Sequence, residues 1–290
     1  MHARVAAATT TALFGLSIIM LPTPPVGAHG VEGLLIVCHR GASAYAPENT
    51  LAAIDRAAAM GYSWVENDVQ RTKDGQLVVI HDATLDRTTN VKQLYPNRAP
   101  WRVKDFTAGE IARLDAGSWF GSRFAGARVP TLKQYMERVS HNHQKLLLEI
   151  KNPDLYPGIE RQVLKLLSNE GWLDRAHLRD RLVVQSFSAK SVQMVHSLRP
   201  AITTAYLGTP PAAQLPDYAR FTDQINSDYK GLSAGYVSAV HALKGPHAKP
   251  MKVFAWIVNS AGTAKRVSGF GVDGVITNVP DVVRRAVTAS

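Results

Sequence analysis

Short runs of apolar and β-branched residues recur along the chain from residue 34 to residue 277, and segments of helical periodicity separate them. Strands buried on both faces of a parallel sheet read as continuous apolar runs, as Leu34–Val37 and Leu182–Val184 do. The predicted strands are Leu34–Cys38, Tyr62–Val69, Lys145–Ile150, Arg181–Ser186, Ile202–Leu207, Gly231–Gly235, Lys252–Val258 and Val272–Thr277. Helices are predicted at Asn49–Met60, Thr131–Asn142, Gly158–Asn169 and Ala189–Leu198, with a weaker pattern at Pro216–Ser227. This alternation predicts the α/β class and a (β/α)8 TIM barrel.

One connection is much longer than a single crossover requires, because residues 70–144 separate the second and third predicted strands. Its first part, Gln76–His81, is expected to form an extra strand beside the barrel. The remainder, about residues 88–130, carries Trp101, Trp119, Phe120 and Phe124 among its aromatic side chains and is either a small packing subdomain or a lid that shapes the substrate site. We therefore expect a barrel with an insertion between its second and third strands.

The first 28 residues are typical of a secretory signal peptide. A short positive start at Met1–Arg4 precedes the apolar run Val5–Leu21, and prolines lead to the small-residue pattern that ends at Ala28. An uncleaved membrane anchor is the alternative, but the run is short for a membrane span and prolines end it. We expect cleavage near Ala28, a secreted or extracytoplasmic protein, and one catalytic domain over residues 29–290.

The net charge and the single cysteine limit which binding partners and which covalent chemistry the protein is expected to have. A net charge of +10 favours anionic substrates or transient contact with an anionic cell envelope or lipid, although it is also compatible with a merely basic secreted surface. The basic residues are scattered and not interleaved with aromatic residues, which argues against nucleic acid. The one cysteine, Cys38, excludes an intramolecular disulfide. A buried structural thiol is favoured over a nucleophile, because Cys38 and His39 should point to opposite faces of their strand.

Acidic side chains follow one another at the ends of the second and third predicted strands. Glu66 and Asp68 are two residues apart, so both point to the same face, and Glu149 ends the neighbouring strand. In such a barrel the functional groups gather at the carboxyl ends of the strands. Three converging carboxylates repel one another unless a proton or cation lies between them. They predict one divalent cation, Ca²⁺ or Mg²⁺ rather than Zn²⁺, whereas any one of them alone would be read as a salt-bridge partner.

Two histidines and two cations complete the candidate chemistry. His39 and His81 each end an apolar run, and their near-neutral pKa suits the transfer of protons to and from a phosphodiester. A single histidine at such a position would more often be structural. Arg40 and Lys151 can contact phosphate oxygens, balance the carboxylates, or do both. The pattern predicts metal-dependent phosphodiester hydrolysis.

The motifs around these residues resemble the glycerophosphodiester phosphodiesterase family, in its secreted bacterial form, over about residues 34–288. The resemblance rests on His39-Arg-Gly-Ala-Ser43, Ala46-Pro-Glu-Asn-Thr-Leu51, Glu66-Asn-Asp-Val-Gln70, Thr72-Lys-Asp-Gly75, Val79-Ile-His-Asp82, Leu85-Asp-Arg-Thr-Thr-Asn90, Ala116-Gly-Ser-Trp-Phe120 and Leu148-Glu-Ile-Lys151. Weaker matches are Gln185-Ser-Phe187, Trp256-Ile-Val-Asn259 and Asp273-Gly-Val-Ile-Thr-Asn278.

This resemblance implies a (β/α)8 barrel that hydrolyses a glycerophosphodiester to glycerol 3-phosphate and an alcohol. By the same resemblance, His39 and His81 match the acid/base pair, Glu66, Asp68 and Glu149 the metal ligands, Arg40 and Lys151 the phosphate contacts, and Trp256 an aromatic position against the glycerol. Asn49 or Thr50 is expected to organise the first helix rather than contact substrate. The alternatives are a phospholipase D-like enzyme acting on lysophospholipids or sphingolipids, and a non-catalytic cell-surface binding protein on the same barrel.

Two features depart from the family pattern. Asn67 stands between the expected metal ligands, where an apolar residue is usual, and its amide would face the helix layer and need partners there. Val91–Arg102 replaces a short glycine-rich turn and contains three basic residues and two aromatic residues. If this segment lies over the mouth of the barrel, it would influence which head group is accepted. The head group, the ion, the oligomeric state, the nucleophile and the first histidine to act stay open.

Overall fold

In the computed structural model, residues 1–2 and 33–288 are described, so nearly all of the predicted signal peptide lies outside the described residues. Eight parallel strands form the barrel: β1 (Leu35–Cys38), β2 (Trp64–Arg71), β4 (Lys145–Ile150), β5 (Leu182–Ser186), β6 (Thr203–Leu207), β7 (Gln224–Asp228), β8 (Lys252–Trp256) and β9 (Gly274–Thr277). They follow one another around the sheet, and β1 pairs with both β2 and β9, which closes it. The predicted (β/α)8 barrel is confirmed.

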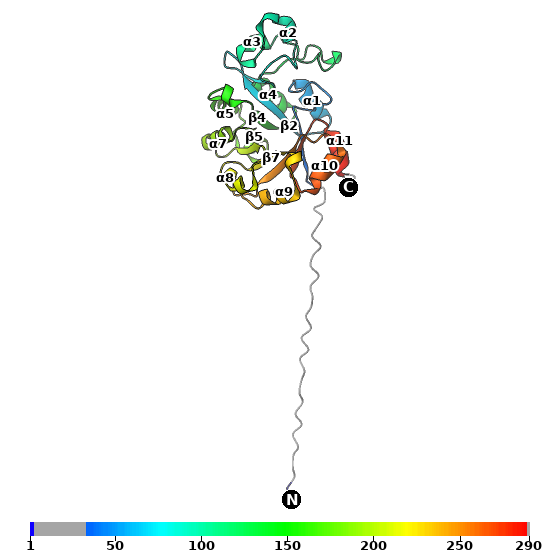
Figure 1. The fold of residues 1–290 in the computed structure, drawn as a ribbon, viewed down its shortest axis with the longest axis vertical. Coiled ribbons are helices and arrows are strands. Elements are labelled where there is room, and N and C mark those ends of the chain that lie inside the picture. The colour runs from blue at the N-terminus through cyan, green and yellow to red at the C-terminus, as the bar shows by residue number, and fades with distance from the viewer. Residues whose placement is uncertain (3–32, 289–290) are drawn as a thin grey trace. The chain divides into compact units, whose positions relative to one another are not determined.

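Helices surround this barrel (Figure 1). Their bounds are α1 (Leu51–Ala59), α4 (Leu132–His141), α5 (Ile159–Asn169), α6 (Arg175–Asp180), α7 (Ala189–Leu198), α8 (Leu215–Tyr218), α9 (Ala234–His241), α10 (Ala261–Gly269) and α11 (Pro280–Thr288). Side-chain oxygens cap several of them, as Thr50 does for α1 and Ser233 for α9. Such a cap satisfies a backbone N–H that the first helical turn leaves unpaired. Thr50, rather than Asn49, therefore organises the start of α1.

The sixth barrel strand was predicted wrongly. Gly231–Gly235 is not a strand: it spans the end of a short 3₁₀ turn, the cap Ser233 and the start of α9. The strand is Gln224–Asp228, which overlaps the end of the predicted weak helix Pro216–Ser227, and the helix there is limited to Leu215–Tyr218. The error has a physical cause, because the inward side chains of β7 are the buried amides Gln224 and Asn226 rather than apolar residues. These amides bond to each other, and Asn226 also donates to Gln185 on β5.

The long connection after β2 begins with the expected extra strand, β3 (Leu77–Val79), which pairs antiparallel with β2. It continues through α2 (Val91–Leu94) and α3 (Ala108–Ile111), which lie together at the upper end in Figure 1. The insertion has a hydrophobic cluster of its own, with buried members Val78, Ile80, Leu85, Val91, Val103, Phe106, Ile111, Leu114, Ala116 and Val129. This cluster makes the insertion a packed subdomain beside the barrel.

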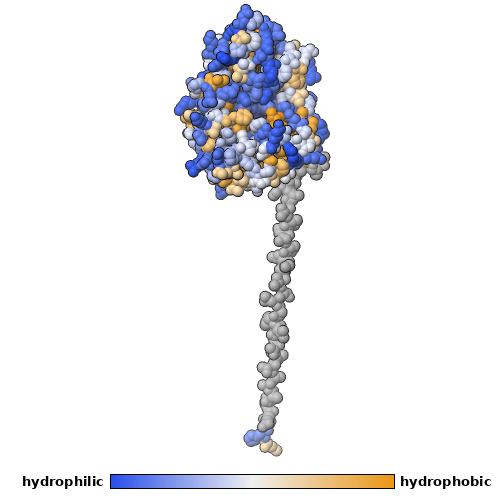
Figure 2. Space-filling model, in the orientation of Figure 1, coloured by the Kyte–Doolittle hydropathy of each residue, from blue (hydrophilic) through white to orange (hydrophobic). Residues whose placement is uncertain are grey.

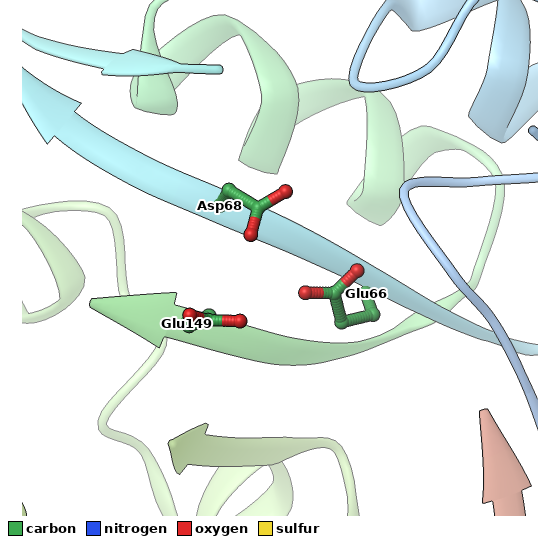
Figure 3. A group of neighbouring side chains, drawn as sticks. All are labelled: Glu66, Asp68 and Glu149. Carbon is green, nitrogen blue, oxygen red and sulfur yellow. The ribbon is translucent and has the colours of Figure 1, made fainter. Parts of the chain in front are cut away.

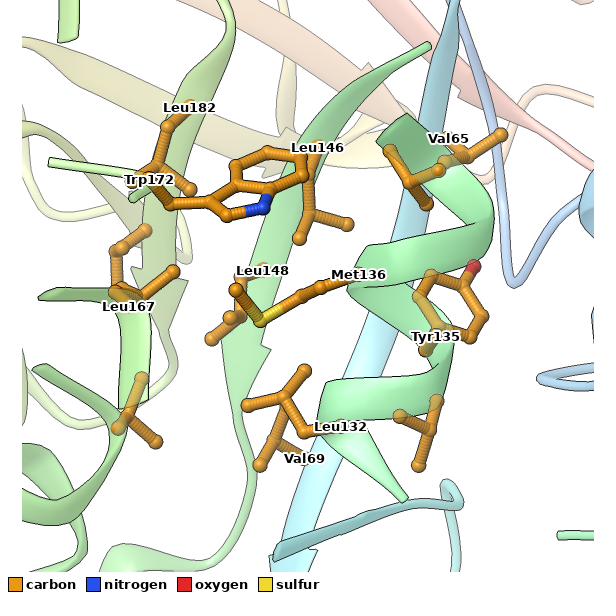
Figure 4. Packing of buried hydrophobic residues seen from close by; sticks show 14 of the residues in the cluster. Val65, Val69, Leu132, Tyr135, Met136, Leu146, Leu148, Leu167, Trp172 and Leu182 are labelled. Carbon is orange, nitrogen blue, oxygen red and sulfur yellow. The ribbon is translucent and has the colours of Figure 1, made fainter. Parts of the chain in front are cut away.

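Side chains of each strand alternate between the barrel interior and the helix layer. On β2, Val65 and Val69 pack outward into a large cluster with α4 and α5, part of which Figure 4 shows. Cys38 belongs to the same cluster, as expected of a structural thiol. Asn67 lies between the two valines and is fully buried, yet neither atom of its amide has a hydrogen-bond partner among the described residues. The predicted need for partners at this position is therefore unmet.

The surface is mostly polar. Figure 2 shows hydrophilic residues over most of the visible face and hydrophobic residues in small scattered patches. Within residues 1–2 and 33–288, no helix combines the length and the apolar character that crossing a membrane requires.

Candidate active site

Three buried carboxylates meet between β2 and β4. The register of the two parallel strands sets Asp68 opposite Glu149 and places Glu66 two residues earlier on the same face of β2. One carboxylate oxygen from each of the three residues lies within 4.8 Å of the others. Figure 3 shows the three side chains converging on one point. The structure thus brings together all three residues that the sequence singled out as metal ligands.

The three carboxylates differ in their electrostatic surroundings. Burial and the neighbouring Asp68 raise the pKa of Glu66 well above its usual range, and they raise the pKa of Glu149 to about 8. Burial also acts on Asp68, but Arg40 and other nearby cations outweigh it and lower the pKa of that carboxyl. Three negative charges at this separation in a dry environment are unfavourable without added positive charge.

The donor set fits a hard divalent cation. Asp68 Oδ1 is buried and accepts no hydrogen bond from any described residue, and one oxygen of Asp68 lies within 4.8 Å of an oxygen of each of the other two carboxylates. Oxygen-only ligands are those that Ca²⁺ and Mg²⁺ prefer. An ion at this point would supply a partner for Asp68 Oδ1 and the positive charge that the cluster needs.

The loop after β1 turns sharply to bring Arg40 against this cluster. Arg40 and Gly41 both have positive φ, 54° and 80°, and a Cβ on Gly41 would stand 2.6 Å from the Cβ of Ala53. The Arg40 backbone N–H donates to Glu66 Oε2 at 2.8 Å, and its guanidinium lies 3.3 Å from Asp68 and 2.8 Å from Glu48. Arg40 is therefore held in place by carboxylates on two sides.

His39 is oriented by a residue from the far end of the sequence. Its Nδ1 lies 2.6 Å from Oδ1 of Asn278, which follows β9, and Ser43 Oγ donates to the same oxygen at 2.9 Å. Because an amide oxygen can only accept, Nδ1 carries the proton and Nε2 is left as the free base. Burial, together with Arg40, lowers the pKa of His39 to about 3, so the ring is neutral.

His81 is held differently, by a carboxylate. Its Nδ1 lies 2.6 Å from Asp82 Oδ1, and its Nε2 is 3.3 Å from Lys151 Nζ. Burial lowers the pKa of His81, and the contact with Asp82 opposes that shift. Asp82 is in turn bonded by Arg87, which also makes two hydrogen bonds to Glu48 at 2.8 and 2.7 Å. Arg87 thus links the His81 loop to the loop after β1.

The buried side chain of Gln70 fixes the backbone of the loop that carries His81. Its amide nitrogen donates to the carbonyl oxygens of Ile80, His81 and Asp82, at 3.0, 3.0 and 2.5 Å. Its own oxygen accepts a hydrogen bond from the Tyr156 hydroxyl at 2.9 Å. No part of the Gln70 side chain is exposed, so this arrangement leaves the loop little freedom.

Lys151 and two aromatic rings border the site on the other side. Lys151 Nζ is 2.8 Å from Glu149 and 3.8 Å from Asp68, and burial is outweighed by these acids, which raise its pKa. The same ammonium lies 5.3 Å from the ring centre of Phe187. Phe187 packs edge-on against Trp256, whose indole N–H donates to the backbone of Asn226. Trp256 therefore lies at the end of β8, with its ring anchored beside the mouth.

Three functional contacts were not foreseen from the sequence. Asn49, expected to serve α1, instead donates to Asp68 Oδ2 at 2.7 Å from a backbone with φ 59°. Asn278 orients His39, and Gln70 supports His81. All three residues lie inside motifs quoted above, but their partners could not be read from spacing along the chain.

The segment Val91–Arg102 packs against the core of the insertion, and its side chains described below do not contact the site residues. Arg98 stacks 3.8 Å from the ring centre of Phe106 and bonds Glu110 at 2.5 Å. Lys92 pairs with Asp86 at 3.1 Å and faces the ring of Trp101. Lys92, Arg98 and the aromatic rings that they contact thus stabilise the insertion, and Arg87 is the basic residue that contacts the loop of His81.

Known proteins are similar to this chain over most of its length. Residues 39–282 match the Glycerophosphoryl diester phosphodiesterase family. A glycerophosphodiester phosphodiesterase of Bacillus subtilis (strain 168) is 34% identical over 295 residues, which cover 94% of this chain and 96% of that protein. One from Caldanaerobacter subterraneus subsp. tengcongensis is 36% identical over 251 residues, covering 86% of this chain and 96% of that protein.

Solved structures agree in fold. An Oleispira antarctica phosphodiesterase, solved with its product sn-glycerol-3-phosphate, superposes with a TM-score of 0.75 at 27% identity and covers 88% of this chain and 97% of its own. A glycerophosphodiester phosphodiesterase from Agrobacterium tumefaciens str. C58 gives a TM-score of 0.68 at 28% identity, covering 87% and 99%. The chain therefore belongs to the glycerophosphoryl diester phosphodiesterase family and is an enzyme of that family.

Proposed function

We propose that the protein hydrolyses glycerophosphodiesters to glycerol 3-phosphate and an alcohol, with a divalent cation and two histidines as proton carriers. The observation that carries the proposal is the convergence of three buried carboxylates with two cationic side chains, beside two individually oriented imidazoles. The named activity of the Bacillus and Caldanaerobacter relatives supports the substrate class, and the product found in the Oleispira structure supports the product.

Glu66, Asp68 and Glu149 would hold the cation, Ca²⁺ or Mg²⁺. When bound there, such an ion supplies a Lewis acid that polarises a phosphate oxygen and stabilises developing negative charge. Arg40 and Lys151 flank the same carboxylates and offer N–H donors to the remaining phosphate oxygens. Phe187 and Trp256 provide an apolar border beside Lys151 for the carbon skeleton of the substrate.

The two histidines suit different halves of the proton transfer. His39 is paired with a neutral amide and stays uncharged, so its Nε2 can accept a proton from the attacking hydroxyl. His81 is paired with the Asp82 carboxylate, which stabilises a protonated ring able to donate to the leaving oxygen. We assign His39 as the base and His81 as the acid of the first step, and the roles reverse if a second step follows.

The test uses the purified mature protein with glycerophosphocholine, and it measures glycerol 3-phosphate and choline separately. We expect stoichiometric release of both, loss of activity with a chelator and recovery with Ca²⁺ or Mg²⁺. His39→Ala and Glu66→Gln should each lower kcat by at least about 100-fold. Full activity of the His39→Ala variant, or full activity of the protein in excess chelator, would refute the proposal.

Matched controls separate chemistry from folding. The exposed residues His141 and Glu137 of α4 lie outside the site, so His141→Ala and Glu137→Gln should keep full activity. Release of phosphocholine and glycerol instead would show that the wrong P–O bond had been assigned. Faster cleavage of lysophosphatidylcholine than of glycerophosphocholine would favour the phospholipase D-like alternative.

Secretion is proposed from residues 1–28 alone. Their order of positive start, apolar run and small-residue exit supports cleavage near Ala28 and export. Intact-mass measurement of protein recovered from the culture medium would check this. A chain that retains Met1 would contradict it.

A further inference from the structure

A cavity of about 800 Å³ lies at the end of the barrel opposite the active site. Its lining includes the residues at which barrel strands begin, such as Leu35 of β1, Trp64 of β2 and Lys252 of β8. The catalytic candidates instead lie toward the carboxyl ends of β1, β2, β4 and β8. The strands are parallel, so the cavity and the active site open at opposite ends of the barrel.

The cavity has an apolar floor and wall. Val37, Leu147 and Phe254 are almost fully buried members of the barrel-interior cluster and line its inner end. Trp64 and Val183, which are half-buried, also line the cavity. The volume falls within the range of roughly 300–1,000 Å³ that is usual for sites of small organic ligands.

The rim of the cavity is positively charged. It carries Lys145, Arg175, Arg179, Lys249 and Lys252 against two acidic residues, Asp180 and Asp223. Both acids are already engaged, because Asp180 pairs with Lys145 at 2.7 Å and Asp223 with His247 at 2.9 Å.

Four of these five rim cations form no ion pair with a residue that the structure describes. Within residues 33–288, they are Arg175, Arg179, Lys249 and Lys252. The rim therefore presents unbalanced positive charge directly around an apolar hollow, which favours a negatively charged ligand group at the opening.

We propose that this cavity binds a single-chain amphipathic anion, with its hydrocarbon chain between Trp64, Val183 and Phe254 and its anionic head group among the rim cations. Charge complementarity selects this class. A compact polyanion would leave the apolar floor in contact with water, and an uncharged hydrocarbon would leave the cations unpartnered. Alkyl carboxylates carry both features and serve as defined probes.

The first experiment is calorimetric titration of the purified full-length mature protein with octanoate, decanoate and dodecanoate, each below its micellar concentration. Burial of the chain should tighten binding about fourfold for every added methylene, or about 15-fold for each step of the series. Dodecyltrimethylammonium, which has the same chain and the opposite charge, should bind at least 10-fold more weakly than dodecanoate.

The second experiment uses variants of the cavity itself. Lys249→Glu with Lys252→Glu should weaken dodecanoate binding at least 10-fold, and Val183→Trp should fill the hollow and abolish it. Lys265→Glu is the matched charge control, because Lys265 is exposed on α10 and does not line the cavity. Thermal unfolding and phosphodiester hydrolysis of each variant show that the barrel is intact.

Affinity that does not change with chain length, equal binding of the cationic detergent, or unaltered binding by the double variant would each overturn the proposal. Loss of binding in His39→Ala, or competition with glycerophosphocholine, would place the ligand at the active site and also overturn it. Binding is measured without turnover, so its outcome is independent of the proposed enzymatic activity.

Discussion

Replacement of Asn67 by leucine should stabilise the protein. The Asn67 side chain is fully buried between Val65 and Val69 on the outer face of β2, and neither of its amide atoms is hydrogen-bonded to a described residue. Leucine has nearly the same branched shape, so its two methyl groups can occupy the positions of the amide oxygen and nitrogen. The substitution removes an unsatisfied polar group without opening a cavity.

The magnitude follows from the cost of burying an unpaired amide. Protein data place that cost at about 1–3 kcal/mol, and Asn67→Leu should raise the free energy of unfolding by this amount. For a domain of this size each kcal/mol corresponds to a Tm change of about 2–4 °C. The Tm should therefore rise by about 2–12 °C, measured by circular dichroism, and urea unfolding should show the matching gain in free energy of unfolding.

The same substitution at Asn226 is the matched control. Asn226 is equally buried, but its amide donates to Gln185 at 2.7 Å and accepts from Gln224 at 2.6 Å inside the barrel. Asn226→Leu leaves both partners unpaired and should destabilise the fold by about 2–5 kcal/mol. The reasoning is refuted if Asn67→Leu leaves the stability unchanged or lower, or if the two variants shift it in the same direction.

Three further predictions concern the site and its surroundings. Gln70→Leu should keep the fold but lower kcat about 10- to 100-fold, because the loop that carries His81 loses three hydrogen bonds; unchanged kcat in steady-state assays would contradict this. Asp82→Asn should move the alkaline limb of the kcat–pH profile to lower pH, because the carboxylate that raises the pKa of His81 is lost, and a shift of the acidic limb instead would reverse our assignment. Cys38 should resist iodoacetamide at pH 8 in the folded protein and react fully in urea, because burial raises the pKa of its thiol to about 12; rapid native labelling seen by mass spectrometry would disprove its burial.

The barrel and the acidic site could be predicted because their signals are local. Apolar and β-branched residues at the strand positions located seven of the eight barrel strands, β7 being the exception. The alternation of side chains along a strand placed Glu66 and Asp68 on one face, and the common polarity of the strands brought Glu149 beside them. The same alternation separated Cys38 from His39.

Contacts that depend on closure of the barrel could not be predicted in this way. Asn278 bonds His39 across 239 residues of sequence, and the contact arises because β9 pairs with β1. The segment of β7 was predicted as a weak helix because its inward side chains are amides rather than apolar residues. A hydrogen-bond partner of these amides, Gln185 on β5, comes near them only in the folded barrel.

The sequence by itself therefore determined the barrel, its strand ends and the five side chains proposed for cation binding and proton transfer. These features could be predicted because hydrophobic periodicity and side-chain alternation depend only on residues close together in the sequence. The tertiary structure alone decided that Asn67 has no polar partner and that Gln70 and Asn278 hold the two histidines. It also decided that the basic segment Val91–Arg102 packs into its own subdomain. The physical reason is that hydrogen-bond satisfaction depends on which distant groups meet after the chain has closed on itself.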